Sequence, residues 1–249
     1  MAFVVFCVLA SGAYCINDVI DFKRDREHPK KKNRPIASGA LSRSTGLVVG
    51  IALVLLALLL TLHLSSYFQL VIVIYIFLQI LYSLFLKGIA ILDILVLSLS
   101  IMLRVLGGVA ATAIDPSPWI LVFSWLLALM LAVGKRYLEL GSRGKAAKLS
   151  RPVLSFYSTR YLGHLMSSLG AVTFVCYLLW CNEVSAAGRF SKLGIYPSSL
   201  FVTYGLFRYQ LLVFHRVFDE DPVKGLLVDG PIMASIFAFI LYLSALMYY

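Results

Sequence analysis

The sequence predicts an all-α fold, a polytopic membrane bundle of about eight spanning helices. Hydrophobic residues make up 61% of the 249 positions and charged residues only 14%, whereas a soluble domain is nearer half apolar and a quarter charged. The apolar residues gather into stretches close to the roughly 20 residues that a helix needs to cross a bilayer. The segments between these stretches alternate between basic and nearly uncharged. Together these observations exclude a water-soluble globular protein.

The apolar stretches set the expected elements in chain order. They span residues 2–16, 45–63, 67–86, 91–113, 119–135, 160–181, 196–214 and 231–248. The first is the shortest and leads directly into a polar motif that begins at Asn17. We expect the whole chain, residues 1–249, to form one transmembrane domain.

Every second connecting loop carries the positive charge. The basic side comprises residues 17–44, 87–90, 136–159 and 215–230, and the other side comprises residues 63–66, 114–118 and 182–195. Because Lys and Arg collect in cytoplasmic loops, we expect a multi-pass plasma-membrane protein whose active site faces the cytoplasm. The net charge of +10 is interpreted first as this topology signal, so no nucleic-acid partner is expected. Four acids in the last basic loop, at positions 219, 220, 221 and 229, are interpreted as a solvated surface.

The first polar cluster lies at the end of the first apolar stretch, in the string NDVIDFKRD. On a helix, Asn17, Asp18, Asp21 and Asp25 fall within about 100° of one another. Three carboxylates on one face repel each other unless a cation neutralises them. Oxygen ligands of this kind suit Mg²⁺, so we interpret Asn17, Asp21 and Asp25 as metal ligands, supported by Asp18. The alternative is an acidic helix end balanced by neighbouring Lys and Arg.

A basic loop, REHPKKKNRPIASG, follows directly. Its prolines predict a structured loop rather than a continuous helix. Lys31 and Arg34 are candidate ligands for phosphate oxygens, because Arg binds an oxyanion as a fork and Lys as a point charge. The alternative for the three consecutive lysines is a topology signal. None of the four histidines is assigned a catalytic role.

The string NDVIDFKRD resembles the NDxxDxxxD motif of the UbiA superfamily of intramembrane prenyltransferases. Further stretches resemble one branch, the decaprenyl-phosphate phosphoribosyltransferases, also called decaprenylphosphoryl-5-phosphoribose synthases. These stretches are DREHPKKKNRPIASG, YSLFLKGIAILDILVLSLSIMLRVLGGVAA, VGKRYLEL and FRYQLLVF with DEDPVKGLLVDGPI. The resemblance implies the helical-bundle fold of the superfamily. It also implies nine spanning helices, and since this chain begins inside the second, we expect the usual first helix to be absent from it.

The second polar cluster lies where the superfamily carries a second Asp-rich motif. Here the helix end holds Lys135, Arg136 and Glu139, whose i,i+3 and i,i+4 spacing brings them together. Two cations suit a phosphate better than a metal ion, so the resemblance implies that these residues bind substrate. The alternative is an ordinary salt bridge at a helix end.

Four further positions match the branch. Tyr82 and Lys87 end the third apolar stretch, where they are placed to close over a phosphate. Asp93 and Arg104 lie eleven residues apart, which places them about 20° apart on one helical stripe. An Arg in an apolar segment costs at least about 2.5 kcal/mol. We therefore expect Arg104 to face the interior and pair with a lipid phosphate or a helix carboxylate. The nearby glycines are interpreted as allowing close helix packing.

The resemblance implies transfer of 5-phosphoribose from 5-phosphoribosyl 1-diphosphate to a polyprenyl phosphate in the membrane, for cell-envelope arabinan precursors. Asp18, Asp21 and Asp25 are the catalytic candidates, and Mg²⁺ is the expected cofactor. The phosphate nucleophile is already ionised near neutral pH, so no general base is needed. One alternative is a UbiA-type prenyltransferase that joins a polyprenyl diphosphate to an aromatic acceptor. The other is a non-enzymatic lipid or solute transporter. The sequence leaves a homo-oligomer open.

Overall fold

The computed structural model describes residues 1–28, 30–112, 115–143, 151–188, 190–217 and 222–248. Within these residues the secondary structure is helical and contains no β-strand, which confirms the predicted all-α class. The elements are α1 (Ala2–Ile20), α2 (Phe22–Glu27), η1 (Lys31–Asn33), α3 (Pro35–Ser38), α4 (Arg43–Thr61), α5 (Ser66–Leu84), η2 (Leu86–Gly88), α6 (Leu92–Thr112), α7 (Pro118–Arg143), η3 (Pro152–Phe156), α9 (Thr159–Ala186), α10 (Lys192–Ile195), η4 (Tyr196–Ser198), α11 (Ser199–Phe214), α12 (Pro222–Val228) and α13 (Gly230–Tyr248).

Seven of the described helices are long and apolar enough to cross a bilayer, namely α1, α4, α5, α6, α7, α9 and α13. The eighth expected span is α11, which has 16 residues. Its length is therefore about 24 Å, less than the roughly 30 Å of a hydrocarbon core. Large side chains such as Phe77, Phe207 and Phe237 are 62–64% exposed, as faces in contact with lipid require. The chain is a multi-pass membrane protein.

Three helices extend beyond the predicted ends, and one of them is α9, which was predicted to end at residue 181 and continues to Ala186. The first span, predicted to end at residue 16, continues to Ile20. The fifth, predicted over 119–135, continues to Arg143, so the predicted loop 136–159 is wrong in its first part. The reason is that burial continues past the apolar stretch, because Leu138 and Leu140 stay on the packed face with Val133. Residues 144–150 of that predicted loop lie outside the described residues.

The chain divides into two compact units. The first contains residues 1–96, 100–115 and 149–152, and the second contains residues 97–99, 116–148 and 153–249. The Asp-rich string therefore belongs to the first unit. The Lys135–Glu139 cluster belongs to the second.

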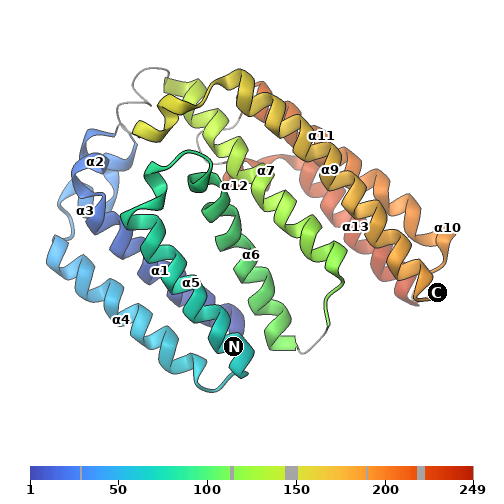
Figure 1. Cartoon of the computed structure of the whole chain (residues 1–249), viewed down its shortest axis with the longest axis horizontal. Helices are drawn as coiled ribbons and strands as arrows, with labels where there is room; N and C mark the ends of the chain where they lie inside the picture. Colours follow the sequence, from blue (N-terminus) through green and yellow to red (C-terminus); the bar gives the residue numbers. More distant parts are fainter. Residues whose placement is uncertain (29, 113–114, 144–150, 189, 218–221, 249) are drawn as a thin grey trace. The chain divides into compact units, whose positions relative to one another are not determined.

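Close backbone packing of α1 against α4 organises the first unit (Figure 1). A β-carbon on Gly12 would lie 2.8 Å from the carbonyl oxygen of Gly50, so only glycine permits this approach. The rings of Phe6 and Tyr75 pack edge to face at 5.6 Å in the core. Gly107 of α6 lies directly against the Phe6 ring, which confirms the interpretation of this glycine as a packing residue.

In the second unit, α7 packs along α9, and α11 packs against both α9 and α13 (Figure 1). Tyr177, Cys181 and Ile195 form its apolar core and are at most 1% exposed. The Tyr177 and Ser198 hydroxyls are hydrogen-bonded at 2.6 Å, which satisfies both polar groups inside that core.

Asp229 is not the solvated acid that the sequence suggested. Arg208 of α11 donates from Nη2 to Asp229 Oδ2 at 2.9 Å, and the Asp229 side chain is 10% exposed. The backbone N–H of Ile232 donates to Asp229 Oδ1 at 3.0 Å, so Asp229 also caps the start of α13. The hydrogen bond from Arg208 lowers the pKa of Asp229. The other three acids of that predicted loop, at 219–221, lie outside the described residues.

Candidate functional site

The Asp-rich string folds as two helices with a break at Asp21. Helix α1 ends at Ile20, Asp21 has φ −86° and ψ 4°, and α2 begins at Phe22. Hydrogen bonds of the i→i−4 type nevertheless continue through the break, from Asp21 N to Asn17 O at 2.8 Å and from Asp25 N to Asp21 O at 2.9 Å. The helical register is therefore kept, although the single helix assumed from the sequence is not.

Two of the four polar side chains converge on Arg34. Its Nη1 donates to Asp18 Oδ1 at 2.6 Å and to Asp25 Oδ2 at 2.8 Å. The side chain of Asp25 is only 5% exposed, that of Asp18 is 21% exposed and that of Arg34 is 38% exposed. Arg34 precedes Pro35 and is extended, with ψ 146°, as a residue before proline prefers. The proline thus helps to aim the guanidinium back at the end of α1.

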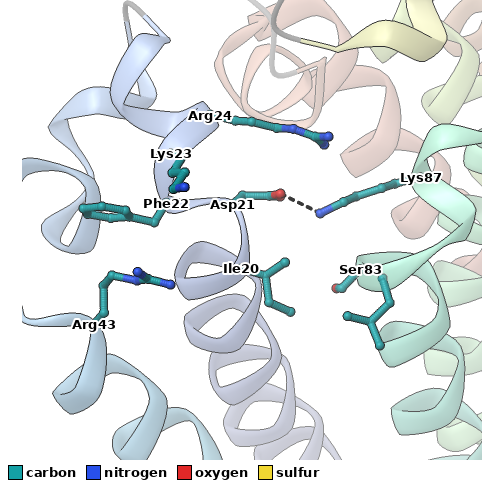
Figure 2. A pocket seen from close by; sticks show the side chains of 9 residues that line it. Ile20, Asp21, Phe22, Lys23, Arg24, Arg43, Ser83 and Lys87 are labelled. Atoms are coloured by element: carbon teal, nitrogen blue, oxygen red, sulfur yellow. Dashed lines mark hydrogen bonds and ion pairs between the residues drawn. The ribbon is translucent and has the colours of Figure 1, made fainter.

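The other two polar side chains face α5 and the η2 turn. Lys87 Nζ donates to Asp21 Oδ1 at 2.6 Å (Figure 2). Ser83 Oγ donates to Asn17 Oδ1 at 3.2 Å. The four polar side chains are therefore sorted into two pairs, one on Arg34 and the other facing Ser83 and Lys87. The three predicted metal ligands, Asn17, Asp21 and Asp25, are divided between these pairs.

The contacts of these four side chains show how the Asp-rich string could bind Mg²⁺. Among the residues that the structure describes, no group of three or more Asp, Glu, His or Cys side chains is arranged around one metal position. Mg²⁺, however, is usually held by one or two carboxylates, and substrate phosphates and water complete its shell. Asp18 and Asp25 direct oxygens at a single positively charged atom. The donor set therefore fits an open Mg²⁺ site that a phosphate ligand completes.

His28 shapes the basic loop. It is buried, with 6% of its surface exposed, and its Nδ1 accepts hydrogen bonds from the backbone N–H groups of Lys30 at 3.3 Å and Lys31 at 3.1 Å. The ring therefore fixes the backbone of the loop that carries Lys31 and Arg34. Sequence reasoning missed this role because a single histidine in a loop has no distinguishing pattern.

Of the remaining predicted residues in the first unit, Tyr82 meets an unexpected partner. Arg151 donates from Nη2 to Tyr82 Oη at 2.7 Å. Asp93 is fully buried. Arg104 donates to Tyr75 Oη at 3.0 Å, and its guanidinium lies 5.7 Å from the centre of that ring. The partner of Arg104 in the structure is thus a phenol, which neither sequence alternative had named.

The cluster on α7 forms in part as predicted. Arg136 Nη1 donates to Glu139 Oε2 at 2.8 Å, which confirms this contact. The Arg136 side chain is 0% exposed and that of Glu139 is 13% exposed, and a buried charge of this kind is stable only when it is paired. Lys135 is half-buried, and among the described residues it forms no ion pair. Lys135 is therefore the cation of this cluster that is open to an added anion.

A basic pocket beside Asp21 was not anticipated. It has a volume of about 370 Å³, and its cationic lining residues are Lys23, Arg24, Arg43 and Lys87. Figure 2 shows Arg24 and Lys87 reaching toward the same space from opposite sides. From the sequence, charge balance by the cations of the Asp-rich string was only an alternative interpretation, and Arg43 was counted within the basic loop 17–44. No local spacing connects Arg43 with the string, so only the packing of α4 against α1 reveals it.

The profile of the UbiA prenyltransferase family matches residues 1–225. The chain belongs to this family. Among its relatives, the decaprenyl-phosphate phosphoribosyltransferase of Mycolicibacterium smegmatis is 30% identical over 100% of this chain and 80% of that protein. The protein of the same name from Mycobacterium tuberculosis H37Rv is 36% identical over 74% of this chain and 61% of that protein. That of Corynebacterium glutamicum is 34% identical over 80% of this chain and 62% of that protein. This UbiA family member thus spans less than two thirds of two of these relatives.

Solved structures agree with the fold. A UbiA homologue from Archaeoglobus fulgidus, bound to DMAPP and Mg²⁺, has a TM-score of 0.75 at 18% identity, and the match covers 99% of this chain and 86% of that one. A UbiA homologue from Aeropyrum pernix K1 has a TM-score of 0.69 at 16% identity, covering 95% and 87%. The predicted UbiA-like helical bundle is therefore confirmed.

Proposed function

We propose that this protein transfers 5-phosphoribose from 5-phosphoribosyl 1-diphosphate to a polyprenyl phosphate and releases diphosphate. The observation that carries the proposal is the α7 cluster, where Lys135, Arg136 and Glu139 stand in place of a second Asp-rich motif. Two cations at this point suit a substrate with more phosphate groups than a prenyl diphosphate has. Relatives at 30–36% identity that bear the name decaprenyl-phosphate phosphoribosyltransferase support the same reaction.

The reaction needs one bond to form and one to break. An oxygen of the acceptor phosphate forms a bond to C1 of the ribose, and the bond from C1 to the diphosphate oxygen breaks. Since the acceptor phosphate is already ionised near neutral pH, no side chain has to remove a proton. His28 accordingly has a structural role, because its Nδ1 holds the backbone of the basic loop.

The Asp-rich string would hold the cofactor. Asp18 and Asp25, whose carboxylates converge on one Arg34 nitrogen, are the proposed Mg²⁺ ligands. Asn17 and Asp21, the other oxygen donors of the string, stay predicted ligands. Bound Mg²⁺ would neutralise the charge on the departing diphosphate. The carboxylates of the string would also stabilise positive charge that develops on the ribose.

Cations around the string would bind phosphate oxygens. Arg34 and Lys87 each lie within 2.8 Å of a carboxylate of the string, and Lys31 is held nearby by His28. In the second unit Lys135 offers a point charge, while Glu139 keeps Arg136 paired. Substrate contacts by Tyr82, Asp93, Arg104 and Arg136 stay predictions.

The proposed location is the plasma membrane, with the reacting groups on the cytoplasmic side. Two observations support this location. Basic loops alternate with nearly uncharged loops along the chain, and the string lies at the end of α1, directly before a basic loop. A site at this surface can receive a lipid from the bilayer and a soluble diphosphate from the cytoplasm.

The test is turnover by the purified protein in detergent with labelled 5-phosphoribosyl 1-diphosphate, Mg²⁺ and a polyprenyl phosphate. We expect a labelled phosphoribosyl lipid and free diphosphate, with no product when Mg²⁺ is chelated. A matched reaction contains a prenyl diphosphate and an aromatic acid. Product from that pair alone would establish the prenyltransferase alternative, and lipid flux across vesicles without any product would establish the transporter alternative.

A further inference from the structure

The basic pocket beside Asp21 has more positive charge than the described residues around it balance. Four cations line it, whereas Asp21 is its single acidic residue. Asp21 is already bonded to Lys87 at 2.6 Å. Among the described residues, Lys23, Arg24 and Arg43 form no ion pair with a carboxylate. Three like charges around one space repel each other, and an anion bound between them would remove that repulsion.

Arg43 occupies an unusual position for a cation. It is the first residue of α4, after the N-cap Ser42, where the helix dipole favours negative charge. Its guanidinium lies 5.1 Å from the centre of the Phe22 ring, and both residues line the pocket. An anion there would gain from the guanidinium and from the helix end together.

The opposite wall of the pocket is apolar. Ile20 is the last residue of α1 and is 43% exposed, and Leu84 is the last residue of α5 and is 53% exposed. Figure 2 shows Ile20 between Arg43 on one side and Ser83 on the other. The pocket therefore lies at one end of three spans, with charge toward the loops and hydrocarbon toward the bilayer. A ligand that fits both walls has a phosphate head and an apolar chain.

We propose that this pocket binds the phosphate head of a membrane lipid that ends in a phosphate monoester. A monoester carries up to two negative charges near neutral pH, one more than the phosphodiester of an ordinary phospholipid. This charge suits three cations that form no ion pair within the described part of the chain. The identity of the lipid rests on the proposed function. If that function holds, the lipid is the polyprenyl phosphate acceptor. Asp21 lines the same pocket, so the acceptor phosphate would lie beside the string that holds the departing diphosphate.

The experiment measures binding of farnesyl phosphate, a short isoprenyl monoester, to the purified full chain in detergent by calorimetry. We expect Arg43→Gln to weaken binding about tenfold, the loss of one charge-assisted contact, and Arg24→Gln to act in the same direction. The matched control is Lys32→Gln, which removes one exposed positive charge of the same basic loop outside the pocket lining and is expected to leave binding unchanged. Arg43→Gln removes a cation from a helix N-terminus, so it is expected to fold, and a melting curve checks this.

Further ligands identify what the pocket recognises. Farnesol, which lacks the phosphate, and phosphatidylglycerol, a phosphodiester, are expected to bind at least tenfold more weakly than farnesyl phosphate. Equal binding of either would overturn the monoester assignment, and inorganic phosphate that binds as tightly as farnesyl phosphate would overturn the lipid assignment. Unchanged binding by Arg43→Gln and Arg24→Gln would place the lipid elsewhere.

Turnover separates this inference from the proposed function. In an active preparation, Arg43→Gln should raise KM for the lipid phosphate about tenfold and leave KM for 5-phosphoribosyl 1-diphosphate unchanged. A wild-type protein that binds farnesyl phosphate through these cations but makes no phosphoribosyl lipid would refute the proposed function and keep the pocket assignment. A change in KM for the soluble substrate instead would refute the acceptor assignment.

Discussion

Replacing Arg34 by Gln should destabilise the metal-free protein and strengthen its response to Mg²⁺. The guanidinium holds Asp25 at 2.8 Å and Asp18 at 2.6 Å. The bond to Asp25, whose side chain is 5% exposed, is worth about 1.5–3 kcal/mol. The bond to Asp18 lies in a more exposed setting, so we discount it to at most about 1 kcal/mol. Arg34→Gln should therefore lower the free energy of unfolding by about 1.5–4 kcal/mol.

Mg²⁺ should reverse this loss. In the wild type, a metal that binds Asp18 and Asp25 must displace Arg34 from the same two carboxylates, whereas in Arg34→Gln they are vacant. A ligand that binds the folded state raises its stability by an amount that grows with its affinity. The shift in melting temperature on adding millimolar Mg²⁺ should consequently be larger in Arg34→Gln than in the wild type. The assay is thermal unfolding in detergent followed by tryptophan fluorescence, with EDTA or with Mg²⁺.

Arg26→Gln is the matched control. Arg26 lies on the same short helix as Asp25, is exposed, and its guanidinium stacks 5.3 Å from the centre of the Phe22 ring. The Arg26→Gln substitution should leave the Mg²⁺-induced shift in melting temperature the same as in the wild type. The reasoning is refuted if Mg²⁺ raises the melting temperature of Arg34→Gln and the wild type by the same amount, because the metal would then not use the carboxylates that Arg34 holds.

The remaining predictions concern topology, packing and pH. In a cysteine-free background, Ser65→Cys should react with an impermeant reagent on intact cells and Ser44→Cys should not; the reverse pattern would invert the topology. Gly12→Ala should lower stability by about 1–3 kcal/mol, because its β-carbon would lie 2.8 Å from a carbonyl oxygen of α4; an unchanged melting temperature would contradict that packing. Arg136→Ala should cost about 3–5 kcal/mol by removing the fully buried partner of an ion pair and lower kcat/KM at least about tenfold, and equal stability would show that the ion pair is dispensable. Because the pKa of Asp229 is lowered from 3.8, its pairing stabilises the fold above that value and is lost as the pH falls through the lower folded-state pKa; Asp229→Asn should remove this acid-dependent part of unfolding curves recorded below about pH 4.

Local spacing along a helix was sufficient to predict one part of the site. Arg136 and Glu139 meet because an i,i+3 pair lies on one side of any α-helix, and the structure confirms their contact at 2.8 Å. The register of the Asp-rich string was predictable for the same reason, although the break at Asp21 was not. A chain with 61% hydrophobic residues likewise has few alternatives to spanning helices, because a bilayer leaves backbone polar groups no partners outside the segment.

Tertiary packing decided which cations meet which carboxylates. Lys87 reaches Asp21 across 66 positions, Tyr82 accepts from Arg151 across 69, and Arg34 folds back over nine and sixteen positions to Asp25 and Asp18. No periodicity within one helix connects these residues, because their separations depend on which helices are neighbours.

The basic pocket has the same origin. Arg43 comes to the end of α1 because Gly12 and Gly50 let the backbones of α1 and α4 approach closely. The sequence by itself therefore determined the membrane fold, the register of the Asp-rich string and the α7 ion pair, all of which follow from composition and helical period. The pairing of each cation with its anion was left to the tertiary structure, because contact between helices depends on how their surfaces fit and not on spacing along the chain.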